Sequence, residues 1–64
     1  TYDLGKSSYR WKDLFVGDAH FSNKGSSNDV DGTWGDWTLQ EGESKIFMIN
    51  NRTGKKYSLK MEEE

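Results

Sequence analysis

Three side chains near residue 20 are of the types that a serine hydrolase uses. Asp18, His20 and Ser22 stand at alternate positions, and His20 is the only histidine of the chain. On a strand they would project in parallel, about 6.5–7 Å apart, because alternate residues point to the same side. A working triad needs hydrogen bonds of about 3 Å and oxyanion donors from other elements. We therefore predict a solvated strand face here and no catalytic residue.

The sequence Asp-Val-Asp-Gly at residues 29–32 has the residue types of a calcium loop. An EF-hand places an acidic ligand first, glycine sixth and a bidentate glutamate twelfth. If Gly32 is the sixth position, Ser27 is the first and Thr38 the twelfth, and neither fits. We predict an Asp-Gly turn and no metal site, and we expect no cofactor.

Asn51, Arg52 and Thr53 form an N-glycosylation acceptor tripeptide. A tight turn at this place already accounts for the asparagine, and such tripeptides are frequent by chance. Phosphate-binding glycine loops and carboxylates paired at a catalytic spacing are both missing from the sequence. We predict that the protein is not an enzyme.

The clearest structural signal is a β-hairpin in the C-terminal third. Residues 45–50 are rich in strand formers, residues 55–61 alternate strictly, and Asn51 to Gly54 has the residues of a type I turn with a G1 bulge. This turn predicts that Ile49 faces Tyr57. One face would then be core, with Phe47, Ile49, Tyr57, Leu59 and Met61, and the other would carry Ile46, Met48, Lys56, Ser58 and Lys60.

Two further strands are expected upstream. Residues 32–40 lead through a turn at Glu41 and Gly42 into the hairpin, and residues 19–22 form a short strand before a polar loop. Pairing Trp37 with Phe47 would place Trp37 on the core face and send Trp34 to the opposite one. A one-residue slip would undo this arrangement.

Residues 8–16 fit two templates, and a short helix is slightly favoured over a strand because Trp11, Leu14 and Phe15 follow the helical period. The predicted fold is mostly β. We expect a small antiparallel meander or open barrel of four to five strands, of SH3-like or OB-like size, with that short helix.

The 64 residues are expected to form one domain over residues 1–61, followed by a frayed acidic tail at residues 62–64. The chain has no cysteine, no apolar run that could cross a membrane and no signal peptide, so we expect a cytoplasmic location. Five acids and no base lie in residues 29–43, whereas five bases and no acid lie in residues 44–61. Neighbouring strands of opposite charge are the simplest explanation.

The aromatic residues exceed what one sheet face can hide. Either residues 8–16 cover the second face, or that face is an apolar patch with a basic border, which is typical of binding hot spots. The predicted partner-binding residues of that face are Trp34, Ile46, Met48, Lys56 and Lys60. Arg52 and Lys55 are predicted contacts to phosphate or to an acidic partner.

These observations predict a small regulatory or inhibitory protein that binds a protein partner. The alternative is a barrel that binds single-stranded nucleic acid, although the acidic stretch and tail would repel a polyanion. A further alternative is a carbohydrate-binding module with a tryptophan platform. The sequence gives no indication of oligomeric state.

Overall fold

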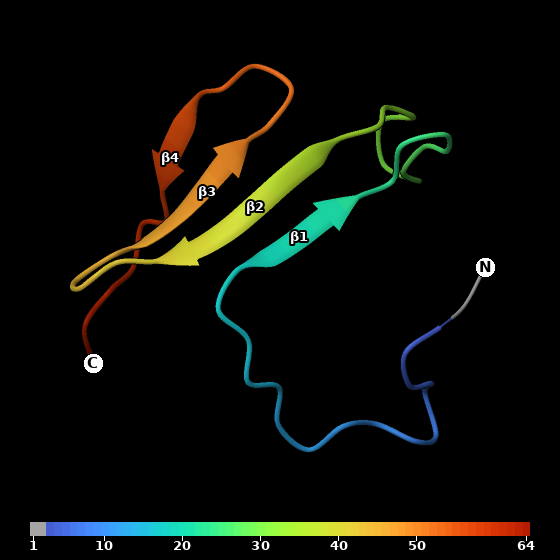
Figure 1. Cartoon of the computed structure of the whole chain (residues 1–64), viewed down its shortest axis with the longest axis horizontal. Helices are drawn as coiled ribbons and strands as arrows, with labels where there is room; N and C mark the ends of the chain where they lie inside the picture. The colour runs from blue at the N-terminus through green and yellow to red at the C-terminus, as the bar shows by residue number, and fades with distance from the viewer. Residues whose placement is uncertain (1–2) are drawn as a thin grey trace.

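The computed structural model describes residues 3–64, which form one antiparallel sheet of four strands (Figure 1). The strands are β1 (Ala19–Ser22), β2 (Asp36–Glu41), β3 (Ile46–Asn50) and β4 (Lys56–Ser58). They lie side by side in chain order, so each strand pairs with the next one along the sequence. The predicted mostly-β meander is confirmed. Each strand lies within its expected segment or extends past it by one residue.

The hairpin turn between β3 and β4 begins one residue earlier than predicted. The side chain of Asn50 accepts a hydrogen bond from the Arg52 N–H, and the Asn50 carbonyl accepts one from Gly54 at 2.7 Å. The Asn50 N–H donates to the Lys55 carbonyl, which closes a four-residue loop. Gly54 has a φ of +79°, the left-handed conformation that glycine adopts without strain.

This loop shifts the hairpin register by one residue from the prediction. Met48 pairs with Tyr57 and Ile49 with Lys56, whereas the sequence had paired Ile49 with Tyr57. Because side chains alternate along a strand, a one-residue shift exchanges the two faces of β4 relative to β3. Tyr57 therefore shares a face with Met48, and the predicted core grouping of Tyr57 with Phe47 and Ile49 is wrong.

The register between β2 and β3 also differs from the prediction. Trp37 pairs with Asn50 and not with Phe47, which lies opposite Gln40. A short turn sets this register, in which the Gly42 N–H donates to the Lys45 carbonyl at 2.7 Å. A Cβ atom on Gly42 would lie 2.7 Å from the Phe47 ring, so any larger residue at this turn would have to displace that ring.

The predicted helix over residues 8–16 is not formed. Residues 3–18 run as irregular chain away from the sheet, with one isolated bridge between Lys6 and Tyr9 (Figure 1). Trp11, Leu14 and Phe15 stay exposed, Phe15 to 93%. The helical spacing of apolar residues alone does not stabilise a helix here, because a short helix in water needs a surface against which its apolar side can pack. The segment therefore does not bury the second face of the sheet.

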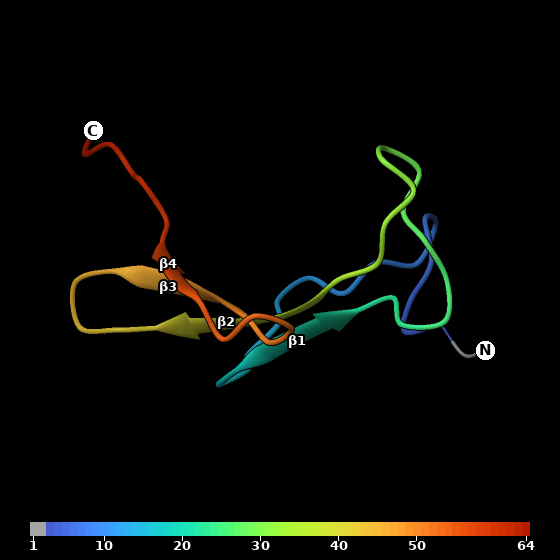
Figure 2. The ribbon, with the colours of Figure 1, turned by 90° about the horizontal axis from the view of Figure 1, so that it is seen from above.

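The sheet is a single layer, as the edge-on view shows (Figure 2). No apolar side chain of residues 3–64 is buried, and Thr38, 6% exposed, is the one buried polar residue of that range. The exposed surface is 6436 Å², about 2,200 Å² more than the roughly 4,200 Å² typical of a folded protein of this mass. Residues 3–64 contain no helix of the length and apolarity needed to cross a bilayer.

Replacing Gly54 with alanine tests the turn that sets the register. A Cβ in the left-handed region costs about 1–2 kcal/mol, so we expect Gly54→Ala to lower the free energy of unfolding by that amount. Gly17→Ala is the control, because Gly17 has no positive φ and no atom within 4 Å of an added Cβ. Urea denaturation followed by tryptophan fluorescence measures both. Equal stability of the two variants would contradict the turn geometry.

Candidate functional site

One face of the sheet is almost entirely apolar. Residues that pair across neighbouring strands point to the same side, and the register brings Ala19, Leu39, Met48 and Tyr57 into one row. We call the surface of this row and its alternate neighbours the apolar face. Its apolar members are Ala19, Phe21, Trp37, Leu39, Ile46, Met48 and Tyr57, and Leu59 extends it beyond β4 through its hydrogen bond to Ile46. Glu41, at the end of β2, and Asn50, at the end of β3, are the polar members of the same face.

Large aromatic groups of the apolar face remain open to solvent. Phe21 is 54% exposed and Tyr57 48% exposed. The Trp37 and Tyr57 rings lie 5.9 Å apart between centroids and are tilted by 43°, a favourable aromatic arrangement that spans β3. Rings that are already held in place lose little conformational entropy when a partner covers them. The apolar face can therefore bind a partner of complementary shape by burying its exposed apolar surface.

The opposite face is organised around the buried Thr38. Its hydroxyl accepts a hydrogen bond from the Asn51 side-chain amide at 2.9 Å, and it lies 3.0 Å from His20 Nδ1. The Asn51 amide also donates to the Asp36 carboxylate at 3.0 Å, and the Asn51 N–H donates to the Asp36 carbonyl. These bonds tie the hairpin turn to the middle of the sheet. They explain Asn51 as a structural residue.

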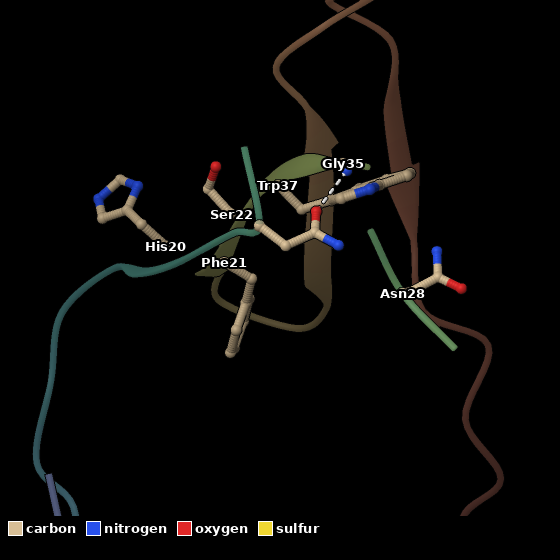
Figure 3. Close-up of a pocket in the computed structure, with 7 residues that line it drawn as sticks. His20, Phe21, Ser22, Asn28, Gly35 and Trp37 are labelled. Carbon is tan, nitrogen blue, oxygen red and sulfur yellow. Dashed lines mark hydrogen bonds between the residues drawn. The ribbon is translucent and has the colours of Figure 1, made fainter. Parts of the chain in front are cut away.

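The trio Asp18, His20 and Ser22 does not converge. His20 lies against Thr38, Asp18 accepts a hydrogen bond from Gln40, and the Ser22 hydroxyl accepts one from the Lys24 N–H. Figure 3 shows His20 and Ser22 on one side of β1 and Phe21 on the other. Each member of the trio has a different partner, as the parallel projection from a strand predicts.

The loop between β1 and β2 is folded around the side chain of Asn28. Its oxygen accepts hydrogen bonds from the N–H groups of Val30 and Asp31, and its nitrogen donates to Asp31 and Thr33. Asp31 in turn accepts bonds from the Thr33 hydroxyl and N–H. Hydrogen bonds from Thr33 and Asn28 hold the pKa of Asp31 below its usual value. The expected Asp-Gly turn is present, with Gly32 at a φ of +73°.

At one end of the apolar face, this loop and the hairpin turn enclose a hollow of about 630 Å³. The Arg52 guanidinium stacks on the Trp34 ring, 3.8 Å from its centroid, and donates to the Trp34 carbonyl at 2.9 Å. The Trp37 side chain lines the same hollow. Arg52 therefore joins the loop to the hairpin, and one face of the Trp34 ring is already covered.

The predicted binding residues are divided between several places. Ile46 and Met48 lie together on the apolar face, whereas Lys56 pairs with Ile49 on the opposite face. Trp34 lies in the loop before β2, and Lys55 and Lys60 lie outside the strands. The sequence reasoning missed the apolar face residues Phe21, Leu39 and Tyr57 as binding candidates. Phe21 alternates with the polar residues His20 and Ser22, and this alternation already indicates that Phe21 lies on the other face of the strand.

The hydrogen bonds to Asp31 predict its titration. Because its folded-state pKa lies below the usual 3.8, the carboxylate stabilises the folded state above that pH, and the contribution is lost as the pH falls through the folded-state pKa. We expect Asn28→Ala to raise the pKa of Asp31 towards 3.8 and Asn51→Ala to leave it unchanged. Carbon-detected NMR of the Asp31 carboxyl against pH measures this shift. An Asp31 pKa unchanged by Asn28→Ala would contradict the network.

Within residues 3–64, no three His, Asp or Glu side chains gather closely enough to hold a metal ion. No protein-family model matches the chain, and no curated protein and no solved structure shows significant similarity to it. The inference of function therefore depends on the geometry of the chain itself.

Proposed function

We propose that this protein is a small non-enzymatic binding module that docks on another protein through its apolar face. The observation that carries the proposal is the lack of any layer over that face. Phe21, Tyr57 and Leu59 are each more than two-fifths exposed on a sheet that buries no apolar side chain among residues 3–64. A contiguous apolar surface of this kind is typical of an interaction site.

The chemistry of the face favours a protein over a nucleic acid. The strand positions on the apolar face include no lysine or arginine, and Lys56 projects from the opposite side. Single-stranded nucleic acid needs cationic groups beside its stacking rings to neutralise phosphate. Among the cations predicted to contact phosphate, Arg52 is stacked on Trp34. That stack also occupies one face of the tryptophan that a sugar platform would use.

A module of this kind regulates or inhibits by occupying a surface of its partner. The area of the face and its rigid aromatic groups supply the affinity, and no reactive side chain is required. The sequence contains no cysteine, which supports action in a reducing compartment such as the cytoplasm.

Site-specific photo-crosslinking tests this proposal. A photoreactive phenylalanine analogue in place of Tyr57 lies on the apolar face, and the same analogue in place of Ser58 lies on the opposite face one residue away. In extracts of the source cells we expect the first to form a discrete crosslink to a protein and the second to form none. Met48→Glu, at the centre of the face, should reduce the crosslink at position 57 at least about tenfold. Equal crosslinking from both positions would refute docking through the apolar face.

A further inference from the structure

We infer that the partner seated on the apolar face is the same face of a second copy of this chain. Two sheets would then pack face to face, about 10 Å apart, as an eight-stranded sandwich. This inference rests on the proposed function, because it names the partner of the same surface. Three properties of the face support it: the surface it leaves exposed, the lack of charge at its centre and the position of that centre.

The first property is the amount of surface left exposed. An aromatic side chain covers about 150–250 Å², so half-exposed Phe21 and Tyr57 offer roughly 100 Å² each. With the rest of the face, two copies bury on the order of 1,000 Å², the size at which a specific interface begins. An interface of this size predicts a weak, reversible dimer.

The second property is the distribution of charge. Glu41, at the end of β2, is the one ionisable carboxylate or base among the β1, β2 and β3 positions of the apolar face, and it pairs with Ile46 at its edge. His20, Asp36 and Lys56 all project from the opposite face. Two copies of a charged face would repel each other, whereas the centre of this face carries no charge that a dimer would bury.

The third property is that the centre of the face is formed by one pair of residues. Leu39 and Met48 are direct partners across β2 and β3, the two inner strands. In a two-fold symmetric dimer, residues at the axis meet the same residues of the second copy. A charge placed at Met48 therefore meets itself, and this separates a second copy from any other occupant.

This symmetry gives a direct test with the full 64-residue chain in sedimentation equilibrium. We expect the wild type to dimerise reversibly between about 1 and 500 µM, and Met48→Glu and Met48→Lys alone each to raise the Kd at least about 30-fold. An equimolar mixture of the two variants should recover a dimer, because the opposite charges then face each other. Lys56→Glu on the opposite face is the control and should dimerise like the wild type.

Three results would overturn the inference: a wild type that stays monomeric throughout, Met48 variants that dimerise like the wild type, or folded variants whose mixture stays monomeric. Far-UV circular dichroism establishes folding, and Leu39→Glu with Leu39→Lys repeats the test if the Met48 pair is unfolded. If the wild type is monomeric and the crosslinker in place of Tyr57 still captures a different protein, a second copy is excluded as the partner. The proposed function then stands. Crosslinks that join only two copies would support the dimer and identify a second copy as the protein partner of the apolar face.

Discussion

The pairing of Met48 with Tyr57 is the constraint on which the account of this protein depends. In a sheet whose side chains alternate between faces, one register decides where every side chain of a strand points. Here the strand pairings place the apolar groups of β1, β2 and β4 on one side together with Ile46 and Met48, whereas Phe47 and Ile49 lie with Lys56 on the other. The four-residue loop closed by Asn50 and Gly54 sets that register. A turn at one end of the apolar face thus determines the composition of that face.

Polar groups stabilise this sheet in the place of an apolar core. Thr38 is buried beneath Asn51 and beside His20, Asn28 organises the β1–β2 loop, and Arg52 links that loop to the hairpin through Trp34. Hydrogen bonds of this kind fix geometry but contribute only about 1 kcal/mol each to stability. The hydrophobic contribution that normally dominates folding is left available on the apolar face. Covering that face therefore completes the fold as well as forming a complex.

The positions of the strands were predicted from the sequence more accurately than the register in which they pair. A segment rich in β-branched and aromatic residues, such as Ile46–Asn50, was recognisable because strand preference is local. The register was not, because Asn50 and Asn51 are both able to open the turn and the choice depends on the bonds of Asn51 to Asp36 and Thr38. The helix over residues 8–16 failed for a related reason: its apolar spacing needs a surface to pack on. Of the predicted binding residues, Ile46 and Met48 share the apolar face, Trp34 and Arg52 meet at the hollow beside it, and Lys56 lies on the opposite face.

The central claim is that the apolar face is open in the single chain and is covered by protein contact. Hydroxyl-radical footprinting over a range of protein concentrations measures this directly, with Tyr57 on the face compared with Tyr9 in the N-terminal segment of the same molecule. We expect comparable labelling of both tyrosines in dilute protein and selective protection of Tyr57 as the concentration rises. Protection of Tyr57 already in dilute protein, independent of concentration, would contradict it, because the chain would then cover its own face.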